Sequence, residues 1–301
     1  MALLVLTLGL PACGPQFTYP AKSVPEAIER IARDEYQIAT EVRVVGSTVG
    51  AVIYVKSLVD STGQVPKDLH EKMGKVMQVV TRVALSTDLP LDYCTVYLRD
   101  MAQGNELVIT RSIDDIKRAN AEAIGIEESL NRTLFGQAKY TPATEGRTQF
   151  VLKEVKQPTF LAEQIVQRIR FNFSKELKDD DAPHPFLLAD GNFSEADGKR
   201  AFRFSLLALK TDEPKETMLK IFKIANDVLK GYQYTAFEEL EIQDYLNRQK
   251  LVVDKDTLVA YWKNKIKDQE ILEKFLIESS SIQEAFKLFG FSAPQDLAPS
   301  P

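Results

Sequence analysis

The sequence is poor in the residues that most often build catalytic and metal centres. Its 301 residues include two cysteines, two histidines and one tryptophan. The cysteines form no CxxC pair, and the histidines, His70 and His184, lie far apart in the chain. A zinc site made from neighbouring cysteines and histidines is therefore excluded, and catalysis that depends on histidine is not expected.

Motifs that mark common enzyme classes are also missing. The chain contains no GxSxG, GxxxxGK[ST], GxGxxG or HExxH. The pairs Asp114-Asp115 and Glu238-Glu239 suit helix starts or exposed strand edges. The aspartates at 179–181 suit a solvated turn, and 190–194 suits a hairpin connection better than a calcium loop. We predict a protein that is not an enzyme and that carries no cofactor or metal.

Charge and composition narrow the class of protein further. The net charge is −5, and no run of lysine or arginine stands out, so a nucleic-acid partner is not expected. The content of 44% hydrophobic and 27% charged residues is that of a folded globular chain. A length of 301 residues favours two ordinary domains over one.

The only long apolar run lies at the start of the chain. Residues 1–12 are apolar, but this segment is too short to span a bilayer as a helix. It ends in Leu10-Pro11-Ala12-Cys13. The stretch resembles the signal peptides of bacterial lipoproteins, in which a short apolar segment ends in a small-residue box closed by a cysteine.

That resemblance implies that Cys13 receives a diacylglycerol, that the chain is cut before it, and that its new amino terminus is acylated. The mature chain would then have 301 − 12 = 289 residues, and it would face the periplasm from the bacterial cell envelope. Gly14, in place of an aspartate, favours the outer membrane. A buried amino-terminal strand and an ordinary cleaved signal peptide are the alternative interpretations. Residues 13–22 would form a tether.

The clearest folded pattern spans 71–109. Apolar residues recur at helical spacing after Pro66, at Leu69, Met73, Val76, Val80 and Val83. Two period-two runs follow, at 93–99 and 105–109, and residues 102–104 suit the hairpin turn between them. Cys94 alternates with the apolar residues of the first run, so we expect a buried, unreactive thiol.

The preceding segment repeats this order of elements. Ser23 and Glu26 form the pattern of a capping box at the start of a helix. Runs at 41–45 and 49–55, joined at Gly46-Ser47, predict a hairpin. Residues 23–137 therefore read as an αββαββ domain with helices on a mostly antiparallel sheet. A second helical pattern begins at Ser112 and continues, with a break at Gly125, to Phe135.

The second half reads as a related domain. Residues 138–150 carry no periodicity and predict a linker, and 293–301 predict a disordered tail. Between them, 151–292 predict a second α+β domain with additional C-terminal helices, the last two at 269–278 and 282–288. The helix from Glu216 matches the helix from Glu71 at an offset of 145, and its two strands match at an offset of 144. Self-similarity at a fixed period predicts an internal duplication.

Together these patterns predict an α+β protein with two related helix and antiparallel-sheet layers, held to the membrane by a lipid at Cys13. We expect a non-enzymatic module that binds an envelope protein or a small ligand. A structural component of an envelope assembly or secretion ring is the first alternative, and an envelope hydrolase without a recognisable motif is the second.

Overall fold

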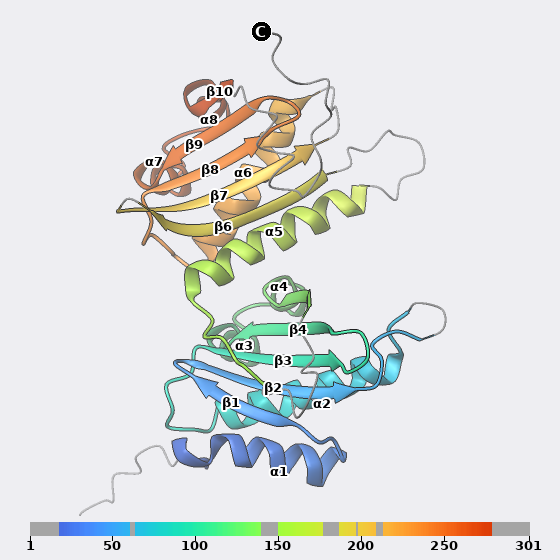
Figure 1. Cartoon of the computed structure of the whole chain (residues 1–301). Coiled ribbons are helices and arrows are strands. Elements are labelled where there is room, and N and C mark those ends of the chain that lie inside the picture. Colours follow the sequence, from blue (N-terminus) through green and yellow to red (C-terminus); the bar gives the residue numbers. More distant parts are fainter. Residues whose placement is uncertain are drawn as a thin grey trace, which may run out of the picture. The chain divides into compact units, whose positions relative to one another are not determined.

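Helical and strand patterns alternate twice along the chain, and each set forms one sheet with helices beside it. The computed structural model describes residues 18–60, 64–139, 150–176, 187–196, 198–208 and 213–278. The chain divides into two units, Met1–Glu154 and Val155–Pro301. Each unit contains one five-stranded sheet (Figure 1), which confirms the predicted α+β class with two sheet layers.

The first unit places its strands in sequence order, β1-β2-β3-β4-β5. β2 and β3 are parallel and the other neighbours are antiparallel. A parallel pair needs a crossover, and α2 supplies it. The elements are η1 (Ala21–Ser23), α1 (Val24–Tyr36), β1 (Glu41–Val45), β2 (Thr48–Val55), α2 (Lys67–Ala84), β3 (Tyr93–Asp100), β4 (Asn105–Ser112), α3 (Ile113–Asn120), α4 (Ile126–Asn131) and β5 (Leu134–Lys139).

The helices of this unit bury one face of its sheet. The apolar stripes of α1 and α2 pack with every second residue of β2 and β3, including Val49, Ala51 and Val96. Cys94 belongs to this core and is fully buried, as its period-two position predicts. Side chains at the intervening positions point to the opposite face, which these helices leave open (Figure 1).

The second unit repeats this topology. Its sheet order is β10-β9-β8-β7-β6, and α6 connects the parallel strands β7 and β8. The elements are α5 (Gln157–Glu176), β6 (Leu187–Ala196), β7 (Lys199–Ala208), α6 (Pro214–Gly231), β8 (Glu239–Asp244), β9 (Gln249–Asp254), α7 (Lys255–Trp262), α8 (Asp268–Phe275) and β10 (Leu276–Glu278).

The two units correspond residue by residue at the predicted offsets. Leu98 pairs with Leu107 across β3 and β4, and Ile242 pairs with Leu251 across β8 and β9, at an offset of 144. The core residues of α2 and α6 match at an offset of 145: Met73, Val76, Met77, Val80, Val83 and Ala84 against Met218, Ile221, Phe222, Ala225, Val228 and Leu229. A duplication in the history of the chain stays a prediction.

Both sheets are mostly antiparallel, as predicted, but they differ from the prediction in two details. Each contains one parallel pair, and each ends in a strand with residues that were predicted to be helical. Leu134 and Phe135 lie in β5, and 276–278 form β10. Both are edge strands that pair on one side only. Because only Leu134 of β5 is buried, β5 lacks the alternation that identifies a strand.

Some boundaries of the predicted elements also differ from those in the structure. Residues 190–194, expected to connect two strands, lie within β6. Ser23 precedes α1 but forms no side-chain cap; its hydroxyl donates to the carbonyl of Pro20. Residues 18–22, assigned to the tether, are instead attached to the first unit, where the N–H groups of Thr18 and Tyr19 donate to the carbonyl of Ser86.

The final helix predicted near 282–288 and the tail at 293–301 lie outside the described residues. Within the described part of the chain, no helix combines the length and the apolar character needed to cross a membrane.

Candidate functional site

The open face of the first sheet carries a group of charged and aromatic side chains. Because successive strand residues alternate between faces, Val52 and Tyr54 of β2, Tyr97 and Arg99 of β3, and Glu106 of β4 share this side. The register places Arg99 directly opposite Glu106. This face is therefore our candidate site.

A buried ion pair lies at its centre. The Arg99 Nε donates to Glu106 Oε2 at 2.7 Å, and the two side chains are only 8% and 10% exposed. The Arg99 guanidinium also lies over two rings, 5.8 Å from the centroid of Tyr97 and 5.2 Å from that of Phe150. Burying two charges costs free energy. Each charge is therefore stabilised by its partner, and the guanidinium is also stabilised by the two rings.

A second polar group extends the cluster towards β1. The Tyr54 hydroxyl donates to Glu41 Oε2 at 3.0 Å, and Arg43 donates to the other oxygen of Glu41 at 2.9 Å. Burial, followed by the hydrogen bond and charge of Glu41, raises the pKa of Tyr54 to about 12. Tyr54 therefore stays protonated and acts as a donor at physiological pH; it is not a base.

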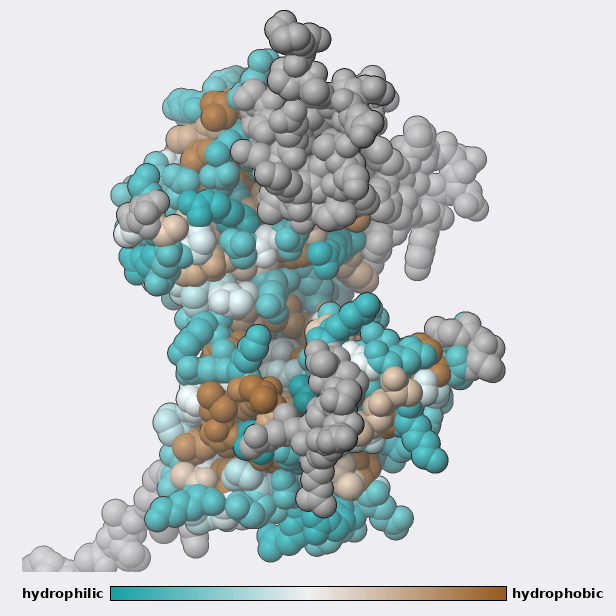
Figure 2. Space-filling model, viewed as in Figure 1, coloured by the Kyte–Doolittle hydropathy of each residue, from teal (hydrophilic) through white to brown (hydrophobic). Residues whose placement is uncertain are grey.

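The chain itself covers this face. Residues 150–154, which we call the strap, lie over β2 and β3 (Figure 1) and reach the turn between β1 and β2. Phe150 and Leu152 are buried and form a small apolar cluster with Val52, against which Tyr54 and Tyr97 pack. The ring of Phe150 meets that of Tyr97 edge to face, with centroids 5.2 Å apart. Brown hydrophobic surface gathers over this part of the unit in Figure 2.

The strap lies in a row of sites formed by Gly46, Ser47, Gly50, Thr95, Tyr97 and Arg99, which we call the seat. Its two glycines leave room for the side chains of the strap. A Cβ on Gly50 would come within 2.5 Å of a methyl of Leu152, and a Cβ on Gly46 within 2.0 Å of Glu154 Oε1. That carboxylate accepts from the backbone N–H of Ser47 at 3.3 Å. Side chains two residues apart along the strap thus enter one row of sites: Phe150 beside Arg99, Leu152 at Gly50 and Glu154 at Gly46.

The strap leaves one polar atom of the seat, the hydroxyl oxygen of Thr95, without a hydrogen-bond partner among the described residues. The Thr95 side chain is fully buried beside Gly50. The residue that covers this position is Leu152, whose side chain can neither donate nor accept. A buried hydroxyl without a partner is costly, so the fit between strap and seat is incomplete.

Sequence patterns alone did not reveal this cluster, and the strap residues fall in the predicted linker and second domain. The unit boundary lies after Glu154, so the strap belongs to the first unit. The signals available in the sequence were the alternation of Phe150, Leu152 and Glu154 and the glycines at 46 and 50. The hairpin turn at 102–104 also implied that Arg99 and Glu106 face each other.

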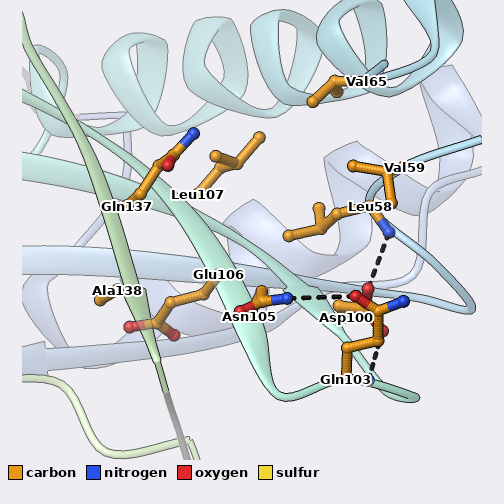
Figure 3. A pocket seen from close by; sticks show the side chains of 10 residues that line it. All are labelled: Leu58, Val59, Val65, Asp100, Gln103, Asn105, Glu106, Leu107, Gln137 and Ala138. Carbon is orange, nitrogen blue, oxygen red and sulfur yellow. Dashed lines mark hydrogen bonds between the residues drawn. The ribbon is translucent and has the colours of Figure 1, made fainter. Parts of the chain in front are cut away.

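A pocket of about 220 Å³ lies at the end of the first sheet, beside the candidate site (Figure 3). Leu58, Val65 and Leu107 supply apolar walls, and side-chain amides and the carboxyl groups of Asp100 and Glu106 supply polar ones. Both carboxylates are already engaged, Glu106 by Arg99 and Asp100 by backbone donors. The pocket therefore offers shape and amide groups for a small polar molecule, without a free acid or base pair.

Asp100 and Asp244 occupy equivalent positions at the ends of β3 and β8. Each accepts from the backbone N–H groups two and three residues further on, which closes the following turn. Burial opposes ionisation of Asp100, but backbone donors from Leu58, Gln103 and Ala102 outweigh it and lower its pKa. Burial raises the pKa of Asp244 despite its own donors. These aspartates serve the fold.

Substitution of Asp100 should reveal this role. In Asp100→Asn, the oxygen that accepts from Leu58 N becomes an N–H donor, and we expect the unfolding free energy of the first unit to fall by about 2 kcal/mol at pH 7. Because the folded pKa of Asp100 is lowered, the stability that its carboxylate contributes is present above the unfolded pKa of about 3.9 and disappears as pH falls through the folded pKa.

Urea titrations of the wild type and Asp100→Asn at pH 7 and pH 3 test this pH dependence. Asp256→Asn, at an exposed site, is the control. An equal loss at both pH values would contradict it.

The open face of the second sheet is different in character. Arg203 and Lys250 lie 3.9 and 2.9 Å from the carboxylate of Glu241, and Arg203 also donates to the hydroxyl of Ser194. The two basic side chains are 39% and 28% exposed. These ion pairs are therefore more exposed than the pair of Arg99 and Glu106 on the first sheet.

The residues singled out from sequence fall in different places. Cys13, the predicted lipidation site, and His184 lie outside the described residues, and His70 is exposed on α2. Cys94 is buried, and loss of hydration raises the pKa of its thiol to about 12, which makes it unreactive. Asp115 is in the first turn of α3, as expected, but it is buried and paired with Arg132 at 2.9 Å.

The described residues contain no group of three or more histidines, cysteines or acids that converge on one point. No protein-family model matches the sequence, and neither does any curated protein. A solved structure, "Crystal structure of Sex pheromone staph-cAM373 precursor", aligns over 80% of this chain and 80% of that one, with 10% sequence identity and a TM-score of 0.23. A similarity at that level carries no argument about the function of this chain.

Proposed function

We propose that this chain is a lipid-anchored protein of the bacterial cell envelope that binds another envelope protein and catalyses no reaction. The observation that carries the location is the apolar run that ends in Leu10-Pro11-Ala12-Cys13. The anchor would hold the first unit close to the membrane. Thr18 is already bonded to that unit and lies 18 − 13 = 5 residues after Cys13, a reach of at most about 18 Å.

The open face of the first sheet supports the binding role. It carries aromatic rings, a buried ion pair and a row of alternating sites that already accept an extended segment. Because the side chains of an extended peptide alternate in direction, such a row of sites can recognise every second residue of a protein segment. The proposed activity is therefore recognition of a protein segment at the membrane surface.

Lipidation is tested by metabolic labelling with a clickable fatty acid during bacterial expression of the full chain. We expect the wild type and Cys94→Ala to carry the label and Cys13→Ala to lose it. Cys94→Ala is the matched control because that thiol is buried in the core. Mass spectrometry of the mature amino terminus should show an acylated Cys13. An intact Met1, or cleavage elsewhere without acyl mass, would overturn the proposed location.

A further inference from the structure

We propose that the seat on the first sheet is a docking site for an extended segment of a partner protein, and that the strap is an internal ligand that keeps it closed. The partner segment has an aromatic residue, an aliphatic or small polar residue two positions later and an acidic residue two positions after that. This inference rests on the proposed binding role but is independent of the lipid anchor.

The chemistry of the seat defines each position of that segment. Arg99 and Tyr97 present a guanidinium and a ring edge to an aromatic side chain, as they do to Phe150. Gly50 leaves the space that a second side chain fills, and Leu152 fills it now. The N–H of Ser47 and the space at Gly46 receive a carboxylate, as they receive Glu154.

The strap is bound as an extended ligand and does not form part of the sheet. Phe150 and Leu152 are buried while Val151, between them, is 67% exposed, so alternate side chains make the contacts. None of the described strand pairings includes residues 150–154. Release of the strap therefore leaves the paired strands of the sheet intact.

The Thr95 hydroxyl points to a ligand other than the strap. It is fully buried in the seat and finds no partner among the described residues while Leu152 covers it. A partner segment that places a polar group at this position gains a hydrogen bond that the strap cannot make. That gain favours exchange of the strap for the partner.

The test measures binding of a fluorescent synthetic peptide, Phe-Val-Leu-Lys-Glu-Val-Lys, to the full-length chain by anisotropy. The peptide has the sequence of residues 150–156. In the wild type, the strap competes at an effective concentration in the millimolar range. We expect Phe150→Ala/Leu152→Ala to bind the peptide at least about tenfold more tightly than the wild type. Val151→Ala, altered at the exposed position of the strap, should bind as the wild type does.

Two controls show that binding occurs at the seat. Adding Gly50→Ala to the double variant should abolish binding, because the new Cβ occupies the space of the aliphatic side chain. A peptide with serine in place of its Phe and Leu should not bind. If the double variant is folded by circular dichroism but binds no more tightly than the wild type, or binds the serine peptide equally, the proposal is wrong.

A milder variant covers the case in which the double variant fails to fold. Glu154→Ala removes the carboxylate that accepts from Ser47 and leaves Phe150 and Leu152 in place, so it should give an affinity between those of the wild type and the fully released strap. An unchanged affinity in this variant would equally overturn the proposal. The peptide-binding measurements use protein without fatty acid, so their outcome does not depend on whether Cys13 is lipidated. Failure of this proposal and failure of the proposed lipid anchor can therefore be distinguished.

Discussion

Replacing Arg99 with methionine should lower the unfolding free energy of the first unit by about 3–5 kcal/mol, the largest effect that we expect from one substitution. The guanidinium is 8% exposed and lies 2.7 Å from Glu106. Without it, a carboxylate that is only 10% exposed is left without its counter-ion, and the cost is that of an uncompensated buried charge. Urea denaturation followed by far-UV circular dichroism measures the change.

Two comparisons isolate the role of burial. Arg200 and Glu238 in the second unit are also 2.7 Å apart but are 45% and 44% exposed, so Arg200→Met should change stability little. The double variant Arg99→Met/Glu106→Leu removes both charges and should recover much of the loss. Equal effects at Arg99 and Arg200 would show that the pair on the first sheet is not effectively buried.

Gly191→Ala should destabilise the second unit by about 1–3 kcal/mol. Gly191 of β6 lies directly opposite Phe204 of β7, and a Cβ there would come within 2.2 Å of the phenylalanine ring. Phe204 is 1% exposed and stacks on Phe202, so its ring has little room to move. Overpacking of a filled core has this cost. Trp262, the only tryptophan, lies in this unit, and its fluorescence follows the transition.

The matched substitution for this experiment is Gly74→Ala in α2. No atom lies within 4 Å of a Cβ built on Gly74, and alanine is the better helix former. This variant should stabilise the first unit by about 0.5–1 kcal/mol. Loss of stability at Gly74, or none at Gly191, would mean that the space around these glycines does not determine the outcome.

Local patterns were enough to predict most helices and the central strands. The buried stripe of α2 and the hairpin of β3 and β4 follow from spacings of 3.6 and 2 residues, which the backbone imposes on any helix or half-buried strand. The burial of Cys94 followed from the same alternation. The offsets of 145 and 144 identified equivalent positions because the two units bury side chains at corresponding positions of corresponding elements.

These local patterns could not predict the edge strands or the parallel pairing. β5 has one buried residue and β10 has three residues in all, so neither produces a periodic signal. The parallel pairing of β2 with β3 depends on which side of the sheet the returning chain joins after α2. No residue within the strands encodes that choice.

By itself, the sequence determined the two α+β units, the class of the chain and the lipoprotein-like start at Leu10 to Cys13. Only the tertiary structure decided that Arg99 and Glu106 form a buried pair, that Phe150 lies beside it, and that Leu152 and Glu154 enter sites on the same face. The reason is physical. Periodicity indicates which side of an element is buried. The segment that buries it comes from a distant part of the chain, and the site that it occupies is formed by several strands together, so no local pattern contains it.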